Sequence, residues 1–151
     1  MASVKDSLRV KGRVGIVLKD KDGQIKETRD VDNLVVTTGL AYIASRIADN
    51  GDTAMSHMAL GSGTAAPAAT DTALGSQLES RKSVSVSHSG GTVTYTATFG
   101  ANESEGAVTE AGIFSAETGG TMLCRVKFDV VNKGASDTMS VSWSISVSAS
   151  A

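Results

Sequence analysis

The stretch DTMSVSWSISVS, residues 137–148, alternates apolar and hydroxyl-bearing side chains. Serine fills the even positions from 140 to 148, and the odd positions hold Met139, Val141, Trp143, Ile145 and Val147. Because successive side chains of a strand point to opposite faces, this pattern predicts a β-strand with one face in a core and an uncharged hydroxyl face outside. The outer face is suited to meet either water or another protein subunit.

The same two-residue period recurs along most of the chain and indicates the fold class. It predicts strands over residues 8–19, 55–60, 84–88, 93–99, 108–115 and 122–130. The turn at Asp20–Gly23 leads into a further strand from residue 24, which Asp32 and Asn33 are predicted to break. With about eight or nine strands in total, we predict a mainly β fold: an antiparallel β-sandwich, jelly-roll-like, forming a single domain over residues 1–151.

One segment departs from the β period and predicts an α-helix near residues 38–49. Leu40, Ile43, Ala44 and Ile47 fall at helical spacing and form an apolar stripe, and we expect the helix to pack on an end or edge of the sandwich. Thr37 or Thr38 is predicted to cap the N-terminus of the helix.

Composition excludes several classes of protein. The 151 residues carry a net charge of −2 and one cysteine, so no disulfide can form within the chain. No apolar run is long enough to span a membrane, and the N-terminus has no signal-peptide core, so we expect synthesis in the cytoplasm without secretion. Aromatic residues make up only 4% and do not alternate with basic ones. The sequence therefore does not favour nucleic-acid binding.

Positive charge gathers at the start of the chain. Lys5, Arg9, Lys11 and Arg13 are opposed only by Asp6 within the first thirteen residues. We expect a basic N-terminal arm, about residues 1–13, that could bind an acidic partner surface.

Candidate catalytic and ligand-binding residues are few. GSGTAA, residues 61–66, matches the loosest dinucleotide pattern, but no helix follows it to hold a pyrophosphate, so we predict a loop that needs small residues. His57 and His88 have no convergent partners in sequence, and Cys124 shares the parity of apolar neighbours. We therefore predict no catalytic residues, no cofactor and no metal site.

Glu110 is the acidic residue with the most apolar surroundings. It precedes the small residues Ala111 and Gly112 and then the apolar Ile113. This context is compatible with a partly buried carboxylate, which would need a cation or several hydrogen-bond donors. We predict a structural ion pair between Glu110 and Arg81, with two separately exposed charges as the alternative.

Several short pieces, in this order, resemble a widespread kind of small bacteriophage virion protein. They are NLVV (33–36), TGLAYIA (38–44), GSGTAAP (61–67), DTAL (71–74), Arg81, EAGIF (110–114), MLCRVKF (122–128) and DTMSVSWSI (137–145). Such domains occur in capsid-associated proteins and in tail-fibre and baseplate components. The resemblance implies a β-rich structural protein without enzyme activity.

Among these roles we favour a capsid decoration, or cement, protein that stabilises the assembled head shell. A tail fibre needs a long shaft, and the chain has no heptad or collagen-like repeat. The expected partners are the major capsid protein or other virion proteins, and edge strands could join two or three copies into a homo-oligomer. A tail, baseplate or tail-fibre component is the first alternative. A carbohydrate-binding module is the second, although Tyr42, Tyr95 and Trp143 are predicted to lie on packed faces.

Overall fold

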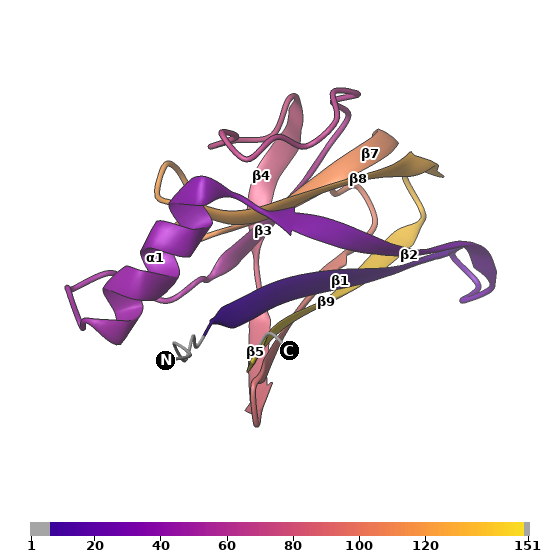
Figure 1. Cartoon of the computed structure of the whole chain (residues 1–151). Helices are drawn as coiled ribbons and strands as arrows, with labels where there is room; N and C mark the ends of the chain where they lie inside the picture. The colour runs from indigo at the N-terminus through magenta and orange to yellow at the C-terminus, as the bar shows by residue number, and fades with distance from the viewer. Residues whose placement is uncertain (1–6, 150–151) are drawn as a thin grey trace, which may run out of the picture.

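A computed structural model of the chain describes residues 7–149 as one antiparallel sheet of nine strands with a single helix (Figure 1). In chain order the elements are β1 (Leu8–Lys19), β2 (Ile25–Val35), α1 (Thr37–Ile47), β3 (His57–Gly61), β4 (Gln77–Ser83), β5 (Ser85–Ser89), β6 (Thr92–Phe99), β7 (Gly106–Phe114), β8 (Met122–Lys133) and β9 (Thr138–Ala149). The prediction of a mainly β chain with one helix is confirmed.

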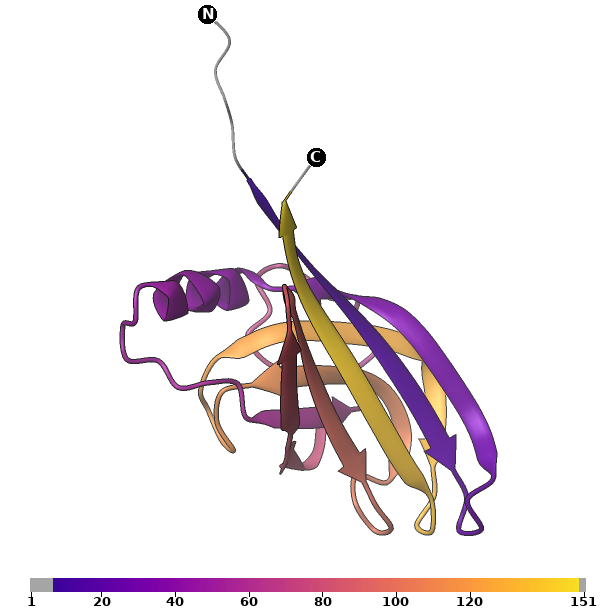
Figure 2. The same cartoon turned by 90° about the horizontal axis from the view of Figure 1, so that it is seen from below.

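The sheet has the strand order β4-β3-β7-β8-β2-β1-β9-β6-β5 and curls until it is nearly closed into a barrel (Figure 2). Its two edge strands, β4 and β5, are consecutive in the chain and are separated by Val84 alone. The Val84 N–H donates to the carbonyl of Ser56, just before β3, at 3.0 Å. One continuous segment therefore bridges the two edges and keeps them close together.

The alternating stretch at residues 137–148 forms most of β9, which lies between β1 and β6 and pairs with both. Its residues Met139, Val141, Trp143 and Ile145 are at most 5% exposed and belong to the main core. Ser140 and Ser142, which alternate with them, are exposed on the outer face. The predicted strand with one apolar face and one hydroxyl face is confirmed.

A buried polar contact lets β2 continue where the sequence predicts a break. Asn33 lies opposite Gly12 of β1, and Asn33 Oδ1 accepts a hydrogen bond from Trp143 Nε1 at 3.1 Å. On the outer face, Arg13 Nη1 lies 3.0 Å from Asp32 Oδ1. Asp32 and the Asn33 side-chain oxygen thus have partners within the sheet, although Asn33 Nδ2 is buried without one among the described residues, and the strand runs on to Val35.

The helix is shorter than predicted and shows part of its apolar stripe to solvent. Val36 rather than a threonine occupies the N-cap position, and it makes no side-chain cap bond. α1 packs against β8, where Thr38 Oγ1 donates to the carbonyl of Met122. Ile43 packs against the main core, whereas Leu40 is 49% exposed and Ile47 77% exposed, so only part of the apolar stripe is covered.

Strand β4 has no apolar alternation, and the sequence does not predict it. Its residues, QLESRKS, are polar at nearly every position. The strand forms because its backbone pairs with β3, with a register shift between Met58 and Leu60. Glu79 of β4 has a positive φ of 55° at this irregularity. Backbone pairing therefore builds β4, with little help from side-chain burial.

Replacing Gly12 with alanine tests the contact inside β1 and β2. A Cβ at Gly12 would overlap Asn33 Oδ1, so the amide that accepts the Trp143 N–H has to move. We expect the free energy of unfolding, measured by urea denaturation, to fall by about 1–3 kcal/mol. Gly15→Ala on the same strand is the control, because its Cβ meets nothing nearer than Ser142 O at 3.9 Å. Equal losses in the two variants would contradict this explanation.

Candidate functional site

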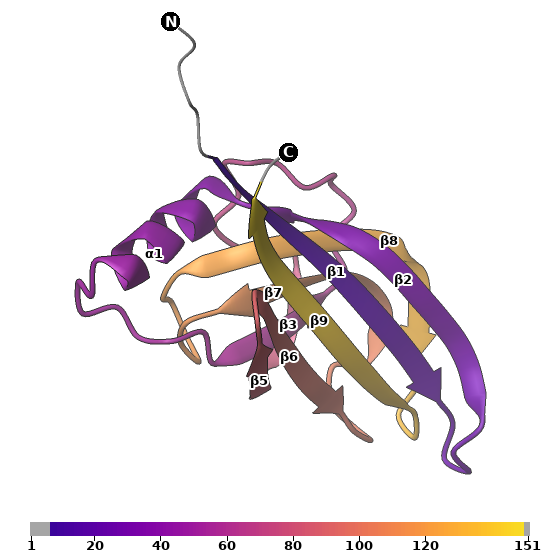
Figure 3. The same ribbon diagram turned by 60° about the horizontal axis from the view of Figure 1, so that its bottom comes forward.

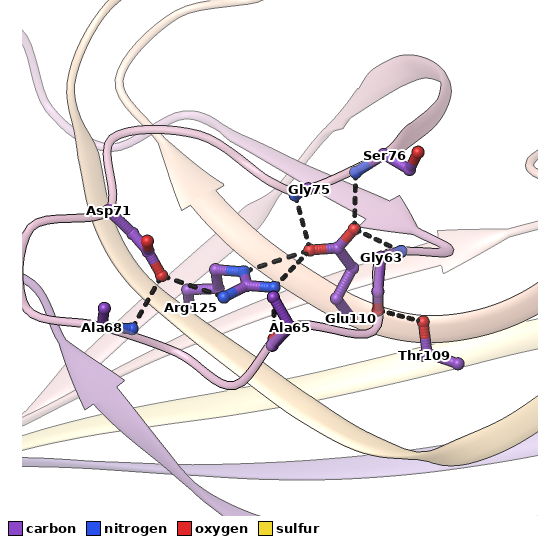
Figure 4. Close-up of polar contacts among 9 residues, drawn as sticks. All are labelled: Gly63, Ala65, Ala68, Asp71, Gly75, Ser76, Thr109, Glu110 and Arg125. Atoms are coloured by element: carbon purple, nitrogen blue, oxygen red, sulfur yellow. Dashed lines mark hydrogen bonds and ion pairs between the residues drawn. The ribbon is translucent and has the colours of Figure 1, made fainter.

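Glu110 of β7 is fully buried, and its carboxylate accepts hydrogen bonds from a single loop (Figure 4). Oε2 accepts from the N–H groups of Gly63 at 2.6 Å and Ser76 at 2.8 Å, and Oε1 accepts from the N–H of Gly75 at 2.8 Å. All three donors lie in residues 62–76, which connect β3 to β4. The carboxylate therefore ties this loop to the sheet.

Arg125 of β8 is the cationic partner of Glu110. Its Nε and Nη2 lie 3.1 and 2.9 Å from Glu110 Oε1. Arg125 pairs in register with Gly112, two residues along β7 from Glu110, so both side chains share one face of the sheet. The guanidinium also donates to Asp71 Oδ2 and to the carbonyl of Ala65, each at 2.9 Å. Arg125 thereby fastens two further points of the same loop.

We call this set of residues the loop clamp. Its members are Gly63, Ala65, Asp71, Gly75, Ser76, Glu110 and Arg125. Glycine is required at position 63 because a Cβ there would overlap the Glu110 carboxylate. The prediction that GSGTAA forms a loop of small residues is confirmed for residues 62–66, whereas Gly61 ends β3. The N–H of Gly63 binds the protein's own carboxylate.

The clamp keeps its carboxylates ionised. Burial acts to raise the pKa of Glu110, but the three loop N–H donors and Arg125 outweigh it, so the pKa lies below its ordinary value. The pKa of Asp71 is also lowered, first by the hydrogen bond from the Ala68 N–H and then, against some burial, by Arg125. A buried carboxylate surrounded by fixed donors has no proton to give. The arrangement suits a structural clamp better than acid–base catalysis.

The predicted pairing of Arg81 with Glu110 is wrong, although the predicted burial of Glu110 is confirmed. Arg81 Nη1 donates to two carbonyl oxygens of the turn between β7 and β8, at 2.9 and 2.7 Å. Its guanidinium carbon lies 3.6 Å from the centroid of the Phe114 ring. Arg81 is on β4, which β3 separates from β7, whereas Arg125 is on the strand next to Glu110.

The basic residues predicted to form an N-terminal arm lie largely within the sheet. Lys5 is outside the described residues. Arg9, Lys11 and Arg13 belong to β1 and pair in register with β9. Arg13 forms ion pairs of 2.8 and 3.0 Å with the two aspartates of β2 that face it. Arg9 and Lys11 are exposed and form no ion pair with another residue of the described chain.

The histidines and the cysteine lie at separate places. Cys124 of β8 is completely buried, and burial raises the pKa of its thiol. His57 Nδ1 lies 2.8 Å from the hydroxyl of Ser56, and His88 Nε2 lies 2.8 Å from the carbonyl of Gly90. Within residues 7–149, no group of three or more His, Cys, Asp or Glu side chains is placed to hold a metal ion.

An apolar groove of about 440 Å³ lies between α1 and the neighbouring ends of β6 and β9. Its lining includes Ile43, Ile47, Tyr95, Leu123, Ile145 and Val147. Val147, the last apolar residue of the alternating stretch, is 39% exposed there. The inner face of the sheet therefore reaches solvent at this end of the molecule.

No family model matches the chain, and comparison with curated proteins and with solved structures finds no match either. Among the helices that the structure describes, none has the length and apolar character needed to cross a membrane.

Replacing Glu110 with glutamine should weaken the loop clamp. The change leaves the buried guanidinium of Arg125 without its main counter-charge and points an amide at N–H donors. We expect the free energy of unfolding to fall by about 3–5 kcal/mol, measured by urea denaturation. Glu103→Gln, which breaks the half-exposed ion pair with Lys82, is the control and should cost less than about 1 kcal/mol. A loss at Glu110 no larger than in the control would show that the clamp is not needed for stability.

The Glu110 carboxylate should make the free energy of unfolding depend on pH. Because the pKa of Glu110 is lowered on folding from an ordinary value of 4.5, its contribution is present above that pH and is lost as the pH falls through the folded pKa. We expect the wild-type free energy of unfolding to drop more steeply than that of Glu110→Gln below pH 4.5. Parallel curves from a series of urea titrations at different pH would contradict this.

Proposed function

We propose that the chain is a non-enzymatic structural protein of a bacteriophage virion, and specifically a capsid decoration protein that binds the assembled head shell. In this role it acts through preformed outer surfaces rather than through a reacting site. Binding to the assembled shell, and not to its free subunits, would shift the equilibrium toward the shell by mass action.

The observation that carries the proposal is the convergence of the sequence pieces that resemble virion proteins. The loop 61–67, Asp71, Glu110 and Arg125 come from four separate pieces, and they meet in the loop clamp (Figure 4). Short motifs that recur by chance have no physical reason to meet at one site. The convergence therefore supports interpreting the pieces as the signature of one fold.

The loop clamp also explains how a surface loop could serve as a docking element. Thr64, Ala65 and Ala66 are exposed, small and uncharged, and the clamp binds the backbone at Gly63, just before them, and at Ala65 itself. A loop that is already ordered loses little conformational entropy on binding. A rigid loop of this kind suits a protein whose task is to fit between neighbouring subunits.

The outer face of the sheet offers a second surface suited to a shell. Hydroxyl groups cover it across three adjacent strands: Ser85, Ser87 and Ser89 of β5, Thr92, Thr94, Thr96 and Thr98 of β6, and Ser140, Ser142, Ser144, Ser146 and Ser148 of β9. Lys11 and Arg9 border this face, opposite Ser146 and Ser148. An uncharged face with free basic groups at one end complements an acidic protein surface, which supports a capsid protein as the partner.

The aromatic side chains weigh against the carbohydrate-binding alternative. Trp143 and Tyr95 are 0% and 9% exposed, and Tyr42 is half-buried with its hydroxyl bonded to the carbonyl of Thr53. Stacking on a sugar requires an aromatic face open to solvent. Trp143, Tyr95 and Tyr42 expose little aromatic surface to solvent.

We further propose that the curled sheet is sandwich-like and related to the jelly roll expected from the sequence. Strands β5, β6, β9 and β1 form one half, and β4, β3, β7 and β8 form the other. β2 leaves β1 and joins β8 at Leu34 and Val35, so it belongs to both halves. Apolar side chains of both halves, such as Trp143 and Ile113, meet in one core.

Counting the protein in virions tests the proposed function. We expect quantitative mass spectrometry of purified particles of the encoding phage to find hundreds of copies, in a fixed ratio to the major capsid protein, and isolated heads to retain them. A few to tens of copies that follow the tail fraction would place the protein in the tail or baseplate instead. Absence from purified particles would overturn the virion role altogether.

A further inference from the structure

We propose that two copies of the chain join edge to edge through β5, which pairs antiparallel with the β5 of the partner subunit around a two-fold axis at Ser87. The two nine-stranded sheets then continue into each other. Of the homo-oligomers expected from the sequence, this arrangement selects a dimer, and it assigns the contact to one strand and one register.

The two edges of the sheet differ in how open they are. β4 carries the charged residues Glu79, Arg81 and Lys82. The loop before β7 also covers it, since Ser104 donates from its hydroxyl to the carbonyl of Leu78 and from its N–H to Glu79. All five residues of β5 are exposed, and β5 lies as an outer strand beside β6 (Figure 3). Covering and charging an edge prevent strand addition, and only β4 has these protections.

The hydrogen-bonding direction of β5 follows from its neighbours. Ser89 and Thr92 flank a two-residue turn, so every second residue of β5, counted back from Ser89, bonds to β6. The N–H of Val84 accordingly points away from β6, toward β3. Val86 and His88 are in phase with Val84, so their N–H and C=O groups also point outward. Within residues 7–149, no backbone bond to another segment uses these groups.

The outward groups of β5 complement themselves under two-fold symmetry. An axis at Ser87 sets Val86 opposite the partner's His88, and His88 opposite the partner's Val86. Each opposed pair exchanges two N–H to C=O bonds, so about four backbone hydrogen bonds form. A two-fold axis also brings side chains near the axis close to their own copies, where like charges repel. β5, with the sequence SVSHS, has no Asp, Glu, Lys or Arg, so a second copy meets no such repulsion.

The apolar groove lies on the inner face next to the same edge. Val86 and His88 pair in register with Tyr95 and Val93 of β6, both of which line the groove. Val86 itself is 54% exposed. A stable dimer buries roughly 800 Å² on each partner, more than five edge residues provide. The groove provides further apolar surface on the inner face beside this edge, within reach of side chains from an added strand.

Disulfide trapping tests the register. In the proposed dimer the two Ser87 residues face each other at a non-hydrogen-bonded position, with Cα atoms roughly 4.5 Å apart, within the range of a disulfide. We expect Ser87→Cys to form a covalent dimer under mild oxidation at least several-fold faster than Ser142→Cys, an exposed outer-face serine on β9. The native Cys124 is buried and should not react. Equal rates for the two variants would overturn the pairing.

Sedimentation of the purified chain tests the dimer itself. We expect the wild type to be dimeric and Val86→Pro to be monomeric, because proline removes an outward N–H while sparing the bonds to β6. Val86→Lys keeps every backbone group but adds a charge near the axis, so it should also be monomeric. If the proline variant does not fold, the result for Val86→Lys is the deciding one. Ile25→Lys, at an exposed isoleucine on β2, should remain dimeric.

A monomeric wild type, or a dimeric Val86→Lys, would overturn the pairing through β5. Because both tests use the isolated chain, neither result bears on the virion role. Absence from virions would overturn that role and leave the dimer standing.

Discussion

The burial of the Glu110 charge is the constraint on which the arrangement of the loops depends. A carboxylate taken out of water without partners costs several kcal/mol, so the fold must bring donors to it from every side. The pairing of β7 with β8 supplies Arg125, and the loop between β3 and β4 supplies three backbone N–H groups. That loop contains no strand or helix, and Glu110 and Arg125 together bind it at several points.

The alternating period predicts strands well where one face meets solvent and fails where it does not. β1, β6 and β9 have a core face and an open face, so their side chains alternate as expected. The start of β8 is buried at every position from Met122 to Val126, because α1 and the clamped loop both contact it. Parity therefore suggests an exposed Arg125 there, although the residue lies inside.

The candidate site could be predicted only in part for a related reason. Small and apolar neighbours mark Glu110 as buried, but the choice between Arg81 and Arg125 depends on strand order, which no local pattern records. One signal was present: Arg125 is the only charge in the apolar run MLCRV, residues 122–126. A lone cation in such a run needs a buried anion. On the loop, the corresponding signal was the glycine at position 63, where a side chain would overlap the Glu110 carboxylate.

The pairing of β1 with β9 has a consequence for how the protein forms during translation. Leu8 lies opposite Ala149, and β1 and β9 are neighbours in the interior of the sheet, each with a strand on both sides. A nascent polypeptide cannot pair β1 with β9 until β9 has left the ribosome. Until then one edge of β1 has no partner strand. Closing so long a stretch of chain is slow. We expect chaperones to encounter this protein before β1 and β9 have paired.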